Sequence, residues 1–275
     1  MARLGGAPAD TVNAMTITED APAPSAARRS PLLRPGRARR ASPWWWLVAV
    51  CAAVLGVTAT AMAVWWAASS QTREVAYDVR GPLATLELDL EDASVTIVGG
   101  ATGPVHVQRT EEFAFGRRPD RTRELDGDSL RIGSHCPDTM IGTCRAAYRI
   151  NVRDNVQLDV RTTSGNVRIS GLSGSAQIDT RSGAITVDGF CGFRLSAISA
   201  SGDVQGAAEC SPDRLELRSG SGDVRAIVPA GRYRVDANSD RGRAEVSDAL
   251  GVADDAPFAV QAISGSGDVT VEGRG

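Results

Sequence analysis

The chain contains no lysine, and all 30 of its basic side chains are arginines. That absence excludes a phosphate-loop lysine, a Schiff-base lysine and a Ser-x-x-Lys nucleophile pair. Histidine is nearly absent too, since only His106 and His135 are available for acid–base chemistry. Neither has a serine or aspartate partner at a recognisable spacing, so we expect both to be ordinary surface residues.

Aromatic residues are scarce, at 5% of the 275 residues, whereas glycine occurs 29 times. Such a composition is poor material for one dense globular core. It suits a thin, repetitive β-structure in which each layer buries only small side chains.

Charge is absent from residues 41–71, whose middle reads WWWLVAVCAAVLGVTATAMAVWW. Trp46 and Trp65 lie 19 residues apart, a separation of roughly 28 Å along a helix. This separation matches a hydrocarbon core of about 30 Å with tryptophans at both interfaces, so we expect a transmembrane helix over residues 44–68. A cleaved signal peptide is the alternative, because Ala59–Thr60–Ala61 resembles a peptidase site, but the apolar run is long for that role.

The charges on the two sides of this span have opposite sign. Residues 1–43 carry seven arginines against three acids, a net charge of +4, and their composition is that of a disordered tail. The positive-inside rule places this tail in the cytoplasm, beside anionic lipid of the bilayer. Residues 69–275 carry 23 arginines against 30 acids, a net charge of −7, which argues against a nucleic-acid partner. We therefore expect a single-pass plasma-membrane protein whose residues 72–275 form an extracytoplasmic domain.

Cysteine usage is consistent with export. Apart from Cys51 in the apolar span, the chain has four cysteines, and an even number outside a membrane indicates two disulfides. Pairing by proximity gives Cys136–Cys144 and Cys191–Cys210, although four cysteines allow three connectivities. Zinc is the alternative, but the Cys-x-x-Cys spacing is missing.

A repeat runs through the second half of the chain. Its marker is a corner that reads Ser-Gly in five copies and ends in Arg-Gly in one. The corner glycines follow one another at spacings of 18, 19, 20, 20 and 25 residues, and they are Gly165, Gly183, Gly202, Gly222, Gly242 and Gly267. Mostly apolar residues stand seven and five positions before each glycine, a serine or threonine three before it, and small or apolar residues two and four after it. This period-two alternation predicts two strands joined by a bend at the glycine.

A seventh copy is predicted upstream, where Leu86–Ile97 aligns without a gap to Leu158–Ile169 and Ala93 replaces the corner glycine. A unit of 18–20 residues has the length of one β-solenoid coil, and such coils must stack about 4.8 Å apart. We therefore expect an all-β, single-stacked β-solenoid of about seven coils, with an excursion at 98–157 that holds further strands and a longer loop. An immunoglobulin-like sandwich is the competing fold, but it gives no reason for the repeated corners.

The stack makes two further expectations possible. Cys191 and Cys210 fall at the same corner of successive coils, where a disulfide can join them. The final strands around Val260 to Val271 have no obvious cap after them, so they are candidates for end-to-end pairing with another chain.

The anchored N-terminus, the SGNV, SGAI and SGDV corners and the CP…C excursion resemble the bacterial putative-adhesin domain family over roughly residues 72–275. The resemblance implies a β-solenoid outside the membrane, in a cell-surface family without an assigned biochemical activity. The corner SDRG at residues 239–242 departs from the family pattern and makes that copy less regular.

The residue after each corner glycine is often acidic, and Asp203 and Asp223 would be stacked on adjacent coils. The simple interpretation is that Asp and Asn favour the turn and accept hydrogen bonds from nearby backbone N–H groups. Asp203 and Asp223 are weak candidates for a surface cation site, because calcium needs six to eight oxygens and each coil supplies one carboxylate. No cofactor is expected.

The sequence thus predicts a non-enzymatic, membrane-anchored surface protein, an adhesin or binding module, with an envelope glycan or a surface protein as partner. One alternative is a carbohydrate-active β-helix enzyme, which needs a groove of clustered carboxylates. Another is an envelope sensor that signals through the cytoplasmic tail.

Overall fold

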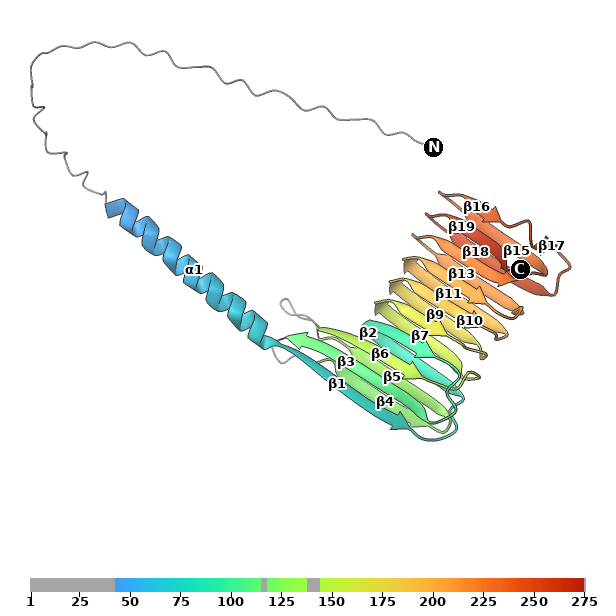
Figure 1. Cartoon of the computed structure of the whole chain (residues 1–275), viewed down its shortest axis with the longest axis horizontal. Helices are drawn as coiled ribbons and strands as arrows, with labels where there is room; N and C mark the ends of the chain where they lie inside the picture. The colour runs from blue at the N-terminus through green and yellow to red at the C-terminus, as the bar shows by residue number, and fades with distance from the viewer. Residues whose placement is uncertain (1–42, 115–117, 138–143, 275) are drawn as a thin grey trace, which may run out of the picture. The chain divides into compact units, whose positions relative to one another are not determined.

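The computed structural model describes residues 43–114, 118–137 and 144–274, which form one α-helix and a 19-stranded β-structure (Figure 1). The helix is α1 (Pro43–Ser69). The strands are β1 (Ser70–Val79), β2 (Thr85–Val98), β3 (Val105–Ala114), β4 (Asp120–Asp126), β5 (Ser129–His135), β6 (Cys144–Asn151), β7 (Gln157–Ser164), β8 (Val167–Ser170), β9 (Ala176–Ser182), β10 (Ile185–Phe190), β11 (Arg194–Ser201), β12 (Val204–Ala208), β13 (Arg214–Ser219), β14 (Val224–Pro229), β15 (Arg232–Ser239), β16 (Ala244–Val246), β17 (Gly251–Val252), β18 (Phe258–Ser264) and β19 (Val269–Arg274). The tail predicted for residues 1–43 lies, up to residue 42, outside the described residues.

Helix α1 carries no charged residue and is long and apolar enough to cross a membrane. Its two polar side chains near the middle satisfy their own hydrogen bonds within the helix. The hydroxyl of Thr58 donates to the carbonyl oxygen of Val54 at 2.9 Å, and that of Thr60 donates to Gly56 at 2.9 Å. Such internal satisfaction is what a hydrocarbon environment requires.

The strands stack as a β-solenoid with two faces. Face A contains β8, β10, β12 and β14, and face B contains β7, β9, β11 and β13; within each face these strands pair in parallel. Strand β2 belongs to both faces, since residues 85–92 pair with β7 and residues 95–98 pair with β8. The predicted coil, one strand to each face with a bend between them, is confirmed.

The strand register aligns equivalent positions of the repeat. On face B, Leu158 lies beside Ala176, which lies beside Leu195, and Leu195 in turn lies beside Leu215. These side chains point inward and are buried, as are Val167, Ile185, Val204 and Val224 of face A. The core is therefore a set of thin aliphatic columns, in which each coil covers its neighbour.

The corner glycines form a column of their own. Gly222 has a φ of 144°, and a Cβ atom built on it would lie 2.5 Å from the carbonyl oxygen of Gly202. Gly202 stands in the same relation to Gly183, and Gly165 to Ala93. Both the left-handed backbone and the close approach demand glycine here. The contact with Ala93 confirms that residues 86–97 are the seventh copy.

A buried hydroxyl column runs beside the glycines. The Ser219 Oγ–H donates to the carbonyl oxygen of Gly202 and the Ser264 Oγ–H to that of Gly222, both at 2.8 Å. These bonds between coils satisfy corner carbonyls that the strand ladders leave free.

The stack does not follow the order of the sequence at its far end. Strands β18 and β19 pair with β13 and β14 on one side and with β15 and β16 on the other (Figure 1). The last strands are thus an inner coil, and the terminal coil is β15–β16. The expectation that the strands around Val260 to Val271 are free to pair end to end with another chain is wrong, because both of their edges are occupied within this chain.

The excursion at 98–157 contains strands, as predicted, and adds a coil. Strands β5 and β6 pair in parallel with β2 on the side opposite β7 and β8. Strands β3, β4 and β1 then close this end as antiparallel neighbours. Residues 138–143 of the expected longer loop lie outside the described residues.

Both disulfides that the spacing predicts are present. Cys136 is bonded to Cys144 across a Cα separation of 6.0 Å, and Cys191 is bonded to Cys210 across 4.7 Å. The second bridge joins successive coils, because Cys191 follows β10 and Cys210 follows β12. Cys51 of α1 is free.

Candidate functional site

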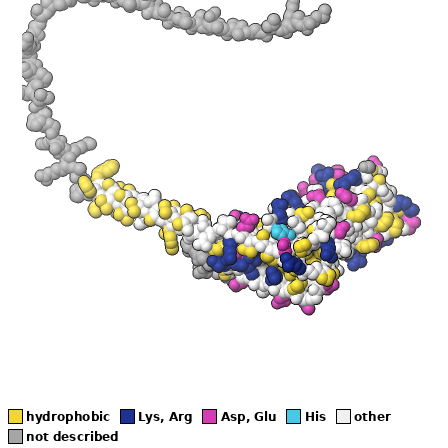
Figure 2. Space-filling view, turned by 60° about the horizontal axis from the view of Figure 1, so that its bottom comes forward, with side chains coloured by type: hydrophobic (Ala, Val, Ile, Leu, Met, Phe, Trp, Pro, Cys, Tyr) yellow, Lys and Arg dark blue, Asp and Glu magenta, His cyan; other side chains and the backbone are white. Residues whose placement is uncertain are grey.

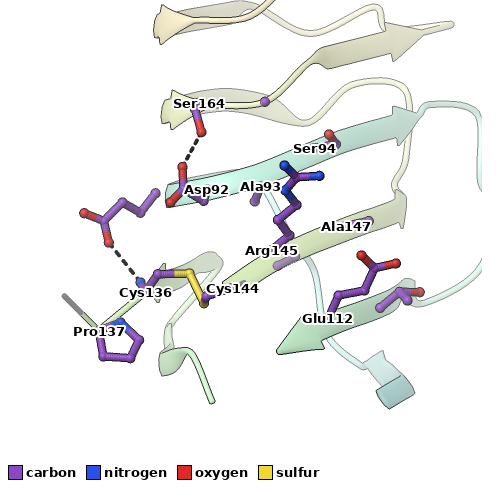
Figure 3. Close-up of a pocket in the computed structure, with 14 residues that line it drawn as sticks. Asp92, Ala93, Ser94, Glu112, Cys136, Pro137, Cys144, Arg145, Ala147 and Ser164 are labelled. Atoms are coloured by element: carbon purple, nitrogen blue, oxygen red, sulfur yellow. Dashed lines mark hydrogen bonds between the residues drawn. A yellow bond between two sulfur atoms is a disulfide. The ribbon is translucent and has the colours of Figure 1, made fainter. Parts of the chain in front are cut away.

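A pocket of about 770 Å³ lies where the excursion meets the regular repeat (Figure 3). Its walls come from the corner of β2 at residues 91–94, from Thr110 and Glu112 of β3, from residues 144–147 of β6 and from the corner at residues 164–165. The Cys136–Cys144 disulfide and Pro137 form its rim. The site therefore combines five segments that are separate in the sequence.

The pocket exists because the corner column is interrupted here. Ala93 stands where the later coils have glycine, and its neighbour on the far side is Ala146 of β6. The disulfide holds the end of the β5 segment against β6, and the Glu91 carboxylate accepts the Cys136 N–H at 2.9 Å. These contacts fix the rim of the pocket.

Three carboxylates and one guanidinium line the pocket. Asp92 accepts a hydrogen bond from the Ser164 hydroxyl, so it and Glu91 are both engaged with protein groups. Glu112 and Arg145 are exposed, and Figure 3 shows the Arg145 side chain extending toward Ser94. Arg145, Glu112 and the Ser94 hydroxyl are therefore the groups available to a ligand.

The lining of this pocket is polar and charged. Glycosidases use two carboxylates that face each other across a bond, whereas Glu91 and Asp92 each serve a hydrogen bond within the fold. Within the described ranges, no three His, Cys, Asp or Glu side chains gather as metal ligands do. The pocket thus offers hydrogen bonds and charge to a ligand.

Asp203 and Asp223 lie on adjacent coils, as expected, and each serves the turn of its neighbour. The Asp203 Oδ1 accepts the backbone N–H of Asp223 at 2.9 Å, and the Asp223 Oδ1 accepts that of Asp268 at 2.8 Å. Asn166 does the same for Ala184 at 3.0 Å. The acidic corners are therefore a ladder of side chain to backbone bonds that links the coils.

The two histidines lie on strands of the excursion. His106 of β3 contacts Asp78 of β1, with Nδ1 and Oδ1 2.6 Å apart, and both side chains are partly exposed. His135 is exposed at the end of β5. The Asp78 partner was missed because it depends on the antiparallel register of β1 and β3, which no local motif reveals.

Of the pocket residues, only Cys136 and Cys144 were candidates from the sequence. The alanine at position 93 and the break in the repeat after residue 97 were the available signals. Elsewhere, Figure 2 shows arginines and acids interspersed over the visible face of the solenoid, without a large region of one sign.

A comparison with protein families finds a match over the later coils of the repeat. The Toastrack DUF4097 family model matches residues 149–272. No curated protein matches the chain significantly.

Crystal structures of similar architecture are distant in sequence. A putative cell adhesion protein from Clostridium sporogenes ATCC 15579 is 11% identical, with a TM-score of 0.45 over 74% of this chain and 100% of that one. A putative adhesin from Bacteroides fragilis NCTC 9343 is 10% identical, with a TM-score of 0.33 over 74% and 97%. A putative lipid binding protein from Parabacteroides distasonis ATCC 8503 is 13% identical, with a TM-score of 0.28 over 73% and 96%.

Proposed function

From the match of the Toastrack DUF4097 family model to residues 149–272, we propose that the chain is a membrane-anchored, non-enzymatic binding protein. Its solenoid lies outside the cytoplasm, and its ligand is an envelope glycan or a surface protein. The pocket between β2, β3 and β6 is the binding site.

The anchor is supported by α1, whose length and apolar composition suit a bilayer. The seven arginines of residues 1–43 favour a cytoplasmic N-terminus. The two disulfides favour an oxidising compartment for the solenoid.

One observation carries the binding proposal. In the regular coils, corner hydroxyls such as those of Ser219 and Ser264 and the corner carboxylates of Asp203 and Asp223 are engaged in hydrogen bonds to the next coil. At the interrupted corner, Arg145 and Glu112 are exposed, and the surrounding space is hollow. Polar groups held on a rigid scaffold beside a cavity are the usual form of a binding site.

The topology is tested by cysteine labelling in intact cells. With Cys51 replaced by serine, Arg241→Cys on the solenoid is expected to react with a membrane-impermeant maleimide. Ser25→Cys in the tail is expected to react only after lysis. The opposite labelling pattern would reverse the proposed orientation, and release of the solenoid from the membrane would indicate a cleaved signal peptide.

Binding is tested with the full chain in detergent micelles on a glycan array and in pull-downs from envelope fractions. Arg145→Ala and Glu112→Ala are expected to weaken capture, whereas Arg168→Ala, an exposed arginine of β8, leaves it unchanged. Equal capture by the wild-type protein and the three variants would exclude the pocket as the binding site. Cleavage of an array glycan would contradict a non-enzymatic role.

A further inference from the structure

The antiparallel end of the solenoid has charged residues at inward positions. On β3 the inward side chains of Arg109 and Glu111 follow Val105 and Val107 and are buried. Opposite them on face B, β4 supplies Arg121 and Arg123, and on face A the neighbouring strand β1 supplies Tyr77. The aliphatic columns of the regular coils thus give way to a polar cluster.

Glu111 is the one carboxylate in this cluster, and it is fully buried. Its Oε1 lies 2.8 Å from the Nε of Arg109 and 3.0 Å from the Nε of Arg121. Arg109 is itself 8% exposed. A single negative charge is therefore shared between two guanidinium groups.

Arg123 adds a third positive charge without a carboxylate of its own. Its guanidinium carbon lies 5.0 Å from the centre of the Tyr77 ring, and no ion pair of Arg123 occurs among the described residues. Together with Glu111, the three arginines leave two positive charges without a partner in this cluster. Of the three arginines, Arg109 is buried, whereas Arg121 and Arg123 are exposed and can be reached by an anion from solvent.

The same arginines line a second pocket. It measures about 300 Å³, and Arg109, Arg121, Arg123 and Tyr77 contribute to its wall, with Thr122 and Gly133 beside them. Three guanidinium forks and two hydroxyl-bearing side chains thus border one small space. Guanidinium groups pair bidentately with phosphate oxygens, and hydroxyl groups donate to them as well.

We infer that this pocket binds a phosphate group, carried either by free phosphate or by an anionic lipid headgroup. The bound anion offsets the two unpaired positive charges. The site differs from the glycine corners and from the pocket beside the Cys136–Cys144 disulfide, and the inference does not rest on the function proposed above.

The test measures protection of individual arginines from phenylglyoxal in the full chain, with modified residues identified by mass spectrometry. In detergent micelles, inorganic phosphate is compared with chloride at equal ionic strength. In a buffer without inorganic phosphate, nanodiscs of phosphatidylcholine are compared with nanodiscs of phosphatidylcholine that also contain anionic phosphatidylglycerol. Arg121 and Arg123 are expected to be protected by phosphate or by phosphatidylglycerol, and the arm that protects identifies the source. Arg168 is the control outside the pocket.

A variant series makes the result specific. Arg123→Gln is expected to weaken protection of Arg121 about tenfold, because one charge-assisted interaction is lost. Arg168→Gln leaves that protection unchanged. Arg123 is exposed and has no described ion pair, so its replacement leaves the unfolding transition in place. The inference is overturned if neither phosphate source protects Arg121 and Arg123, or if Arg168 is protected equally. It is also overturned if Arg121 remains fully protected in the Arg123→Gln variant.

Discussion

At the scale of single residues, the corner column is the strictest constraint in the molecule. Gly222 combines a φ of 144° with a carbonyl oxygen 2.5 Å from where its Cβ would be. The inward aliphatic columns tolerate exchange among Leu, Val, Ile and Ala. In the coils that follow Ala93, the corner glycine is therefore the residue least open to replacement.

We expect Gly222→Ala to lower the free energy of unfolding by about 3 kcal/mol, because the methyl group meets backbone in a strained conformation. Gly103→Ala is the matched control, since a Cβ at Gly103 has no atom within 4 Å. Denaturant unfolding of both variants measures the difference. A loss of equal size in the two variants would contradict the role of the column.

The hydroxyl column gives a pair of opposite expectations. Ser219→Ala removes the 2.8 Å bond to Gly202 and leaves a buried carbonyl with one partner fewer, at a cost of about 1 kcal/mol. Thr180 lies at the equivalent position, but its buried hydroxyl has no hydrogen-bond partner within the described structure. Thr180→Val is therefore expected to be neutral or stabilising. Thermal unfolding of the two variants distinguishes these outcomes.

Tyr77 is expected to make the stability of the fold decrease at alkaline pH. Burial raises the pKa of its phenol above the ordinary value of 10.0, although Arg109 and Arg123 act in the opposite direction. A raised pKa means that the contribution of this residue to stability is full below pH 10.0 and is lost as the pH rises through the folded-state value. Tyr77→Phe is expected to reduce the loss of stability at alkaline pH. Unfolding curves at neutral and alkaline pH measure this loss of stability. An identical loss in the wild-type protein and the Tyr77→Phe variant would refute the prediction.

At the scale of elements, the Cys191–Cys210 bridge ties the loops that follow β10 and β12. Its closed segment has a sequence separation of 19 residues. Replacing both cysteines by serine is expected to lower the unfolding free energy by about 3 kcal/mol through the larger entropy of the unfolded chain. Chemical denaturation under non-reducing conditions provides the measurement, and an unchanged midpoint would show that stacking alone holds these coils together.

The sequence allowed the coil to be predicted, since alternation, corner glycine and hydroxyl recur in register. It did not allow the order of the last coils to be predicted, because Val235 and Val260 are equally able to pack beside Leu215. One signal was overlooked: SGSGDV occurs at residues 219–224 and 264–269, and these identical segments are direct neighbours. Each segment has a glycine at its second position, Gly220 in one and Gly265 in the other, and these two glycines permit the close contact.

The candidate site was harder to predict than the coil. Its pocket depends on which strand covers Ala93, and that strand, β6, lies about fifty residues further along the chain in a region without the repeat. The pocket lined by Arg109, Arg121 and Arg123 did leave a local signal in the sequence. In VHVQRTEEFA the inward positions change from Val105 and Val107 to Arg109 and Glu111, so the expected aliphatic column is broken.

At the scale of the whole molecule, the exchanged coil order predicts an unusual response to truncation. Removing residues 258–275 takes out an inner coil and leaves β15–β16 without the neighbour it packs against. Removing residues 230–275 leaves a stack that ends at β14. We expect the shorter protein to resist limited proteolysis and the longer one to be cut within residues 232–246. Equal resistance would contradict the pairing of β15 with β18.

The inner position of β18 and β19 also determines when the domain can be completed during synthesis. Earlier coils can settle on the preceding coil as soon as they emerge, because their neighbour has already been made. The coil of residues 232–246 must wait until residues 258–274 have been added, because β18 and β19 are the strands it pairs with. Until residues 258–274 follow, the coil of residues 232–246 is therefore unpaired on the side that β18 and β19 come to cover, and in that state it is exposed to proteases.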